Sequence, residues 1–229
     1  MDFLRTIQEG TPLFLQGVKM TVLISILAIL IGMVIGFFVC LMRLSKKGVL
    51  GAVLRAISGV YVWIIRGTPM IVQSFIVYFG MPQVIGKIIP GFKIDSYTAG
   101  LITLSLNAGA YLSEVFRGGI QAIPKGQTEA ARSLGLSKAK TMVKVVLPQA
   151  IKVAIPSMVN QFIITIKDSS ILSVIGLADL VNRAKVYVGK SYQFFATYIT
   201  IAVYYLVIIS ILMVISNYLE KRMSYEHKG

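Results

Sequence analysis

Long stretches without a charged residue constrain this chain of 229 residues more than any other feature. Five such runs cover residues 20–42, 67–86, 96–113, 153–166 and 191–219, with lengths of 23, 20, 18, 14 and 29 residues. A helix needs about 20 mostly apolar residues to cross a lipid bilayer. The runs at 67–86 and 153–166 extend to full spans once Arg66 and Lys152 are admitted near their ends. The pattern predicts an all-α integral membrane protein and excludes a soluble globular domain.

The composition supports a membrane protein. Hydrophobic residues make up 56% of the chain and charged residues only 14%, whereas soluble domains carry about 25% charged residues. The net charge of +14 does not indicate a nucleic-acid partner, because the basic residues lie in the connections between apolar runs and form no patch with interleaved aromatic side chains. Cys40, the single cysteine, lies inside an apolar run and is expected only to pack. The N-terminus lacks a basic segment before a short apolar core, so we expect no cleaved signal peptide.

Five helices are predicted within one transmembrane domain of residues 1–229, over residues 12–44, 55–85, 96–121, 145–172 and 193–220. Five spans would place the two termini on opposite sides of the membrane. If the N-terminus is outside, the inner segments 42–55, 117–144 and 220–229 hold 13 Lys and Arg residues, and the outer segments 1–15, 82–95 and 172–192 hold six. Because cytoplasmic connections carry an excess of Lys and Arg, we expect the N-terminus outside and the C-terminus inside.

The second predicted helix contains a break. The stretch Ile65-Arg66-Gly67-Thr68-Pro69 interrupts it, because Pro69 lacks the N–H that a continuing helix needs. We expect the helix to restart at Pro69 with Thr68 as its N-cap. Such a restart leaves unpaired N–H groups and the positive end of a helix dipole inside the protein, where transporters hold anionic groups. The alternative is a simple kink lined by neighbouring helices.

The next two predicted spans carry polar residues at helical spacing. Steps of three and four place one set on a single face of each helix: Thr103, Asn107, Ala110 and Glu114 in one, and Ser157, Gln161, Thr165 and Asp168 in the other. Polar side chains are costly in hydrocarbon, so both faces should point to the bundle interior or to a water-filled cavity. Two facing stripes would form a passage for a polar solute.

The ionisable residues in these spans also have structural interpretations. Glu114 lies three residues before Arg117 and could simply neutralise it. Lys167 and Asp168 are adjacent, so on a helix they point about 100° apart. In the first span, Gly32 and Gly36 form a small-residue pair that either lets another helix approach closely or only relieves crowding.

The longest polar connection covers residues 117–144. Pro124 and Gly126 are expected to end the preceding helix, and Thr128 to cap a new short helix with Glu129 in its first turn. Small residues beside the exposed Leu134 and Leu136 suit docking against another protein, or an amphipathic helix lying on anionic lipid.

This connection resembles the EAA motif of ABC-importer permeases. The matching residues are Glu129-Ala130-Ala131, Gly135, Val145 and Leu147-Pro148, with Val where Ile is usual. Five further stretches look like the polar-amino-acid branch of that family: Arg66-Gly67-Thr68-Pro69, Asn107-Ala108-Gly109-Ala110-Tyr111, Glu114, Arg117-Gly118-Gly119-Ile120 and Lys167-Asp168-Ser169-Ser170. The resemblance covers residues 15–220 and implies a dimerising type I importer fold in the cytoplasmic membrane.

The resemblance implies a coupling helix in the connection at 122–144. Glu129, Ala130, Ala131 and Gly135 would insert into a groove on a cytoplasmic ATPase subunit. The sequence has no G-x-x-x-x-G-K-[ST] phosphate loop, so ATP and Mg would be bound by that partner and this chain would bind no cofactor itself. The other expected partners are a second permease chain, either a copy or a paralogue, an extracytoplasmic solute-binding protein, an amino acid and the lipid membrane.

In this family ATP binding would close the ATPase dimer and open the passage outward, and hydrolysis would reset it. The candidate solute-binding residues are Thr68, Met70, Asn107, Glu114, Gln161, Lys167 and Asp168. Backbone N–H groups at Thr68-Pro69-Met70 could bind the substrate carboxylate, and Glu114 or Asp168 a cationic group. The family often has Asn where Asp168 stands, which favours a basic amino acid.

Two other classes of function compete with this one. An ion-driven secondary transporter should carry internal inverted repeats, and none is visible. A membrane anchor or assembly subunit would have no use for polar stripes inside its spans. Enzyme chemistry is not expected, because no acid/base pair or metal cluster occurs and His227, the single histidine, lies in the C-terminal tail.

Overall fold

The computed structural model describes residues 3–45 and 48–225, and these residues form helices and no strand. The main helices are α1 (Phe3–Arg43), α2 (Val49–Gly67), α5 (Ser96–Gln121), α8 (Leu147–Asp168), α9 (Leu180–Ser191) and α10 (Phe194–Tyr225). Short elements connect them: α3 (Met70–Phe75), the π-helix η1 (Ile76–Gly80), α4 (Met81–Ile85), α6 (Lys125–Ser133), α7 (Lys138–Thr141), the π-helix η2 (Met142–Val146) and the 3₁₀-helix η3 (Ser169–Ile175). The all-α prediction is confirmed for the described residues.

Four helical segments are long and apolar enough to cross a membrane: Phe3–Arg43, Val49–Gly67, Lys138–Ile175 and Phe194–Lys221. Length and composition therefore identify four spans in the described part of the chain, one fewer than predicted. The predicted span that is missing from these four is the third, and the corresponding helix α5 matches the predicted bounds at 96–121. Its 26 residues are long enough to cross a bilayer, but it carries one of the polar stripes.

Several predicted boundaries were wrong. The first helix begins at Phe3 and not at residue 12, and Pro12 lies inside it. The fourth helical segment begins at Lys138, because α7, η2 and α8 follow one another without a break. The helix α9 was missed, although Asp179 caps its N-terminus. Its buried residues Leu180, Ala184, Tyr187 and Val188 follow the helical spacing that could have identified it.

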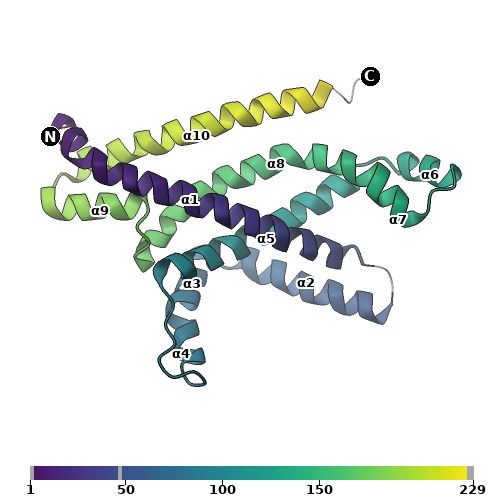
Figure 1. Ribbon diagram of the computed structural model, residues 1–229, viewed down its shortest axis with the longest axis horizontal. Helices are drawn as coiled ribbons and strands as arrows, with labels where there is room; N and C mark the ends of the chain where they lie inside the picture. The colour runs from purple at the N-terminus through teal and green to yellow at the C-terminus, as the bar shows by residue number, and fades with distance from the viewer. Residues whose placement is uncertain (1–2, 46–47, 226–229) are drawn as a thin grey trace.

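Helix α5 is the centre of the molecule (Figure 1) and contacts α1, α2, α3 and α8. Helices α3 and α4 form an arm that projects away from the long helices, and the start of α1 and the end of α10 lie at opposite ends of the structure (Figure 1). Many large apolar side chains of α1 and α10 are exposed, as expected for helices that face lipid.

Glycines allow the close contact between α1 and α5. A Cβ atom on Gly36 would lie 2.9 Å from the Gly109 carbonyl oxygen, and one on Gly32 would lie 2.8 Å from the Ala108 Cβ atom. Both distances are shorter than real Cβ contacts allow. Of the two interpretations of this glycine pair, close approach of another helix is therefore the correct one, and the helix is α5.

Candidate functional site

The predicted break in the second helix is present. Helix α2 ends at Gly67, Thr68 and Pro69 are extended, and α3 begins at Met70. Thr68 is not the N-cap of the new helix, as the sequence had suggested. Its hydroxyl instead donates a hydrogen bond to the Ile64 carbonyl 2.8 Å away, back into α2. The restart lies one residue later than predicted because Pro69 keeps an extended ψ of 136° and takes the N-cap position itself.

Gln73 holds the break together, and the sequence analysis missed it. Its side-chain amide nitrogen donates to the carbonyl oxygens of Ile65 and Thr68, at 2.8 and 3.0 Å, and lies 2.9 Å from the Thr68 hydroxyl. These contacts satisfy carbonyl groups that the end of α2 leaves unpaired. The Gln73 amide oxygen is buried without a hydrogen-bond partner. The detectable signal was an amide side chain inside an uncharged apolar run.

The break lies beside η3, the segment that follows α8. Helix α3 packs against η3, which begins directly after Asp168, and against α5. The Met70 side chain is buried in a core cluster with Leu172 and Ile175 of η3. At the break, therefore, only the backbone of Met70 is available, because its side chain is buried in this core. The break and η3, which are about 100 residues apart in the chain, become neighbours only in the tertiary structure.

The two acidic candidates have different surroundings. The Glu114 carboxylate is paired with two arginines, Arg43 of α1 and Arg117 of its own helix. Asp168 is half-buried, and no hydrogen bond or ion pair holds its carboxylate within residues 3–45 and 48–225. The ion pair between Glu114 and Arg117 is the structural interpretation that the sequence offers for Glu114. The ion pair with Arg43 was not predicted. Of the two carboxylates, only Asp168 is open to a cationic ligand without first losing an ion pair.

The remaining stripe residues are mostly buried. Asn107 and Gln161 are 8% and 5% exposed. The hydroxyls of Thr103 and Thr165 donate to carbonyls of their own helices, Ala99 and Gln161, so they are satisfied locally. The α5 and α8 helices that carry the two stripes are in contact.

The Lys167 side chain lies at a different cavity. It lines a separate cavity of about 270 Å³ together with Tyr198 and Tyr205 of α10 and residues around Ser170. Asp168 is not among the residues that line this cavity.

A cation–π contact was also missed. The Arg66 guanidinium carbon lies 5.0 Å from the centroid of the Tyr111 ring, which joins the end of α2 to the middle of α5. The contact places a positive charge two residues before the break. Its sequence signal was the single charge next to the run at 67–86.

The polar connection forms the short helix α6, but this helix begins earlier than predicted. It begins at Lys125 after Pro124, three residues before the expected cap Thr128, so Glu129 lies in the second turn and not the first. Glu129 and Ala130 are exposed, whereas Ala131 is buried. Proline favours a helix start because its N–H is not needed there, and this preference outweighed the capping hydroxyl.

Gly135 ends this helix. Its φ of +81° is in the left-handed region, where glycine adopts the conformation without a steric penalty. The Leu136 N–H donates to the Ala131 carbonyl and the Gly135 N–H to the Arg132 carbonyl, at 3.2 and 3.0 Å. This Schellman arrangement fixes where α6 stops. Leu134, just before the glycine, is 83% exposed, while Leu136 is only partly exposed, which corrects the expectation that both would be.

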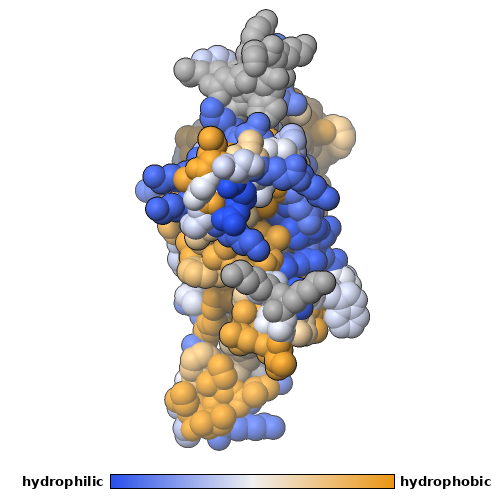
Figure 2. Space-filling view, turned by 90° about the vertical axis from the view of Figure 1, so that its right-hand side faces the viewer, coloured by the Kyte–Doolittle hydropathy of each residue, from blue (hydrophilic) through white to orange (hydrophobic). Residues whose placement is uncertain are grey.

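Helix α6 rests on the start of the long helix that leads into the membrane region. It contacts η2, and Ile123, Val146 and Ala150 form a small core at this junction. Figure 2 looks at this end of the molecule and shows hydrophilic side chains gathered over its middle and upper part. A rigid body that contacts α6 would therefore act directly on the helix that ends at Asp168.

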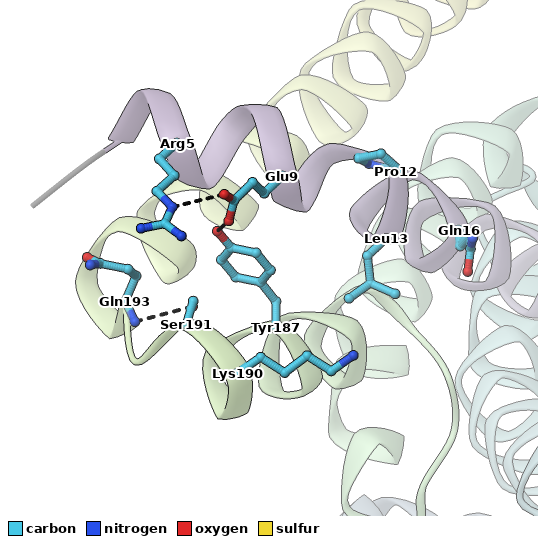
Figure 3. A pocket seen from close by; sticks show the side chains of 9 residues that line it. All are labelled: Arg5, Glu9, Pro12, Leu13, Gln16, Tyr187, Lys190, Ser191 and Gln193. Atoms are coloured by element: carbon cyan, nitrogen blue, oxygen red, sulfur yellow. Dashed lines mark hydrogen bonds and ion pairs between the residues drawn. The ribbon is translucent and has the colours of Figure 1, made fainter.

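A polar cavity of about 550 Å³ lies at the opposite end, between the start of α1 and the junction of α9 with α10 (Figure 3). Arg5 donates to Glu9 with a nitrogen–oxygen distance of 2.9 Å, and the Tyr187 hydroxyl lies 3.5 Å from the other Glu9 oxygen. Lys190 completes the charged lining. The sequence analysis named none of these residues as a site.

Asp179 anchors α9 at this end. Its carboxylate accepts hydrogen bonds from the N–H groups of Val181 and Asn182, at 3.1 and 3.0 Å. The carboxylate is fully buried, and burial raises its pKa to about 6 even though these hydrogen bonds and Lys185 act in the opposite direction. The N–H of Leu180, the first residue of α9, donates to the Thr21 hydroxyl of α1 at 3.1 Å.

We expect the stability of the protein to fall as the pH rises from about 4 to about 6 because of Asp179. The folded state holds the proton up to a higher pH than the unfolded state, so deprotonation costs stability over this range, up to about 3 kcal/mol. The variant Asp179→Asn keeps an N-cap oxygen but does not titrate, so it should lose this part of the pH dependence and unfold at a higher temperature at pH 7. Thermal unfolding in detergent at pH 4, 5, 6 and 7 measures the difference; parallel profiles for the two proteins would contradict it.

No cluster of metal-binding side chains occurs in the part of the chain that the structure describes. The tail residue His227 lies outside the described residues.

Residues 28–225 match the model of the family described as binding-protein-dependent transport system inner membrane component. The probable amino-acid ABC transporter permease protein YckA of Bacillus subtilis is 39% identical over 95% of this chain and 92% of its own length. The arginine transport system permease protein ArtQ of the same organism is 37% identical over 97% of both chains, and the glutamine transport system permease protein GlnP of Escherichia coli is 36% identical over 95% of both.

Two kinds of solved structure are similar to this one. A crystal structure of an amino acid ABC transporter with histidines has a chain that is 39% identical, with a TM-score of 0.89 over 97% of this chain and 99% of that one. An inward-facing structure of the MetNI methionine ABC transporter gives a TM-score of 0.76 at 20% identity, over 92% and 96% of the two chains. The second likeness concerns the fold alone.

Proposed function

This chain belongs to the family of binding-protein-dependent transport system inner membrane components, and from that membership we propose that it is the permease subunit of an ATP-driven importer of polar amino acids. Family membership makes it a transport subunit. The observation that carries the finer proposal is the packing of α3, which begins at the break, against η3, which begins directly after Asp168. Together the break and Asp168 would offer backbone N–H groups and an acid to a solute with a carboxylate and a cation.

We place five spans in the membrane, namely the four apolar segments and α5. Its polar residues are buried against α1, α3 and α8, so hydrocarbon need not meet them. The excess of Lys and Arg on one side places the N-terminus and α9 outside and α6 and the C-terminus inside. The start of α1 and the end of α10 lie at opposite ends of the structure (Figure 1), as this topology requires. The full permease would contain two such chains, each either a copy or a paralogue of the other.

The coupling step is assigned to α6. Glu129 and Ala130 are exposed for contact, and Gly135 ends the helix sharply, so a separate cytoplasmic ATPase could hold this element as one rigid piece. Movement of α6 would be transmitted through η2 to α8, because α6 packs on η2. ATP and Mg would stay on the ATPase. Closure of the ATPase dimer would open the passage outward, where a solute-binding protein delivers the substrate, and hydrolysis would return it to the inward-facing state.

Basic amino acids are the substrates we favour within the polar class. The α-carboxylate would lie at the N–H groups of Met70 and the next residue, which have no partner inside α3. The cationic side chain would bind Asp168. Among relatives, ArtQ is named for arginine and one similar structure was solved with histidines, whereas several others are named for glutamine.

Uptake into reconstituted vesicles tests the proposed function. We expect accumulation of labelled arginine only when the permease, its ATPase, ATP and a solute-binding protein are all present. An ion-driven carrier would instead accumulate substrate without ATP and lose this activity when ionophores collapse the gradients. A membrane anchor would transport nothing under either condition. ATP-independent uptake that ionophores abolish would overturn the proposal.

The variant Asp168→Asn should lower the uptake of arginine at least tenfold, because the amide removes the negative charge that pairs with the substrate cation. Uptake of glutamine, where the transporter accepts it, should change much less. Glu114→Gln serves as the comparison, since its carboxylate is already paired with Arg43 and Arg117. Initial uptake rates at several substrate concentrations measure both effects. Unchanged arginine uptake by Asp168→Asn would remove this residue from the cation site.

A further inference from the structure

The cavity beside the N-terminus is not part of the candidate solute site. It lies at the other end of α1 from α6, and its walls come from segments far apart in the sequence, the first turns of α1 and residues 187–193 (Figure 3). In the proposed topology this end faces the outside. The inference below therefore rests on the proposed function.

The cavity carries one positive charge that nothing in the described chain compensates. Arg5 and Glu9 neutralise each other as an ion pair. Lys190 also lines the cavity and has no ion-pair partner among the described side chains. The second oxygen of Glu9 accepts a long hydrogen bond of 3.5 Å from the Tyr187 hydroxyl. The cavity thus offers both a free ammonium group and a carboxylate oxygen that can accept another hydrogen bond.

Tyr192, beside the cavity, has an unusual backbone. Its φ of 57° is in the left-handed region, and no other non-glycine residue of the described chain has a positive φ. This position caps the end of α9, where glycine is usual and a bulky residue is strained. The side chain gains no packing in return, because it is 77% exposed. Strain of this kind concentrates at functional positions.

We propose that Tyr192 and Lys190 form a docking site for the extracytoplasmic solute-binding protein. An acidic side chain of that protein enters the cavity and pairs with Lys190, and the Tyr192 ring packs in an apolar pocket on the partner. Exposed tyrosines that become buried are frequent energetic centres of protein interfaces, and opposite charges set the register of docking. A protein can also donate a further hydrogen bond to the Glu9 carboxylate, whereas a lipid phosphate brings only acceptors.

The test uses the complete permease–ATPase complex in nanodiscs of zwitterionic lipid and the substrate-loaded solute-binding protein. We expect Tyr192→Gly and Lys190→Glu each to weaken binding of that protein at least tenfold and to remove its stimulation of ATP hydrolysis. Basal hydrolysis should stay unchanged. Tyr192→Gly should unfold at the same or a higher temperature, since glycine adopts this backbone without strain, so its loss of docking cannot come from misfolding.

Lys87→Glu is the matched control, because it makes the same charge reversal in the connection after α4, away from the cavity. Wild-type affinity of both cavity variants would overturn the inference, and so would an equal loss in Lys87→Glu, which would indicate only long-range charge. A loss confined to nanodiscs of anionic lipid would make the surface a membrane contact and would also overturn it. Failure of the proposed function can be distinguished from failure of this docking site. In the first case the wild-type permease itself would recruit no ATPase or would not bind the solute-binding protein.

Discussion

The variant Glu129→Lys should abolish ATP-dependent transport while leaving the membrane helices folded. Glu129 is exposed on α6, and its side chain makes no hydrogen bond or ion pair with the described residues. Its replacement therefore costs the isolated permease little, as is usual for exposed surface positions. Against a partner, reversing a charge that is buried at the interface costs several kcal/mol, which corresponds to a 100-fold or larger loss of affinity. Co-purification of the ATPase with the tagged permease measures this loss directly.

Gln127→Lys provides the matched control for this experiment. It adds a lysine to the same helix, two residues earlier, so the side chain points about 160° away from that of Glu129. Gln127 is also exposed. We expect this variant to retain the ATPase and to transport normally. Retention of a stoichiometric ATPase by Glu129→Lys would refute the assignment of α6 as the coupling helix, whatever the uptake assay gave.

The second large effect is expected at the contact between α1 and α5. Gly36→Leu places a side chain where even a Cβ atom would lie 2.9 Å from the Gly109 carbonyl oxygen and 3.0 Å from the Ser113 nitrogen. These are backbone atoms that cannot rotate away, so the two helices must separate. Overpacking a tight core costs about 1–3 kcal/mol or more, and separation also weakens the Arg43–Glu114 ion pair between the same helices. We expect little folded protein after detergent extraction.

Gly59→Leu distinguishes this packing effect from a general effect of glycine replacement. Gly59 lies inside α2, a candidate span, and a Cβ atom there would meet nothing within 4 Å. This variant should express and unfold like the wild type, or slightly better, because glycine weakens a helix interior by about 1 kcal/mol. Size-exclusion profiles and thermal unfolding in detergent measure both proteins. Equal stability of Gly36→Leu and Gly59→Leu would contradict the close packing of α1 on α5.

The class of the protein and the position of the helix break follow from the amino-acid sequence alone, and the sequence also predicts which segment is the coupling helix. Each of these depends on local properties. Apolar run length decides whether a segment can cross a bilayer, proline removes an N–H wherever it stands, and the EAA motif lies in one continuous segment. The exact helix starts were less predictable, because Pro124 and Thr128 compete as start signals and both are compatible with the pattern.

Only the tertiary structure decided which polar residues can serve the candidate site. Glu114 and Asp168 look equivalent in the sequence, but Arg43, 71 residues away from Glu114, pairs with it, while Asp168 stays without a partner among the described residues. In the same way, Gln73 closes the break and Tyr192 is held in a strained turn. A side chain in an apolar environment is controlled by the few groups that pack around it. These groups come from distant segments, so the burial and pairing of an acid cannot be read from its neighbours in the chain.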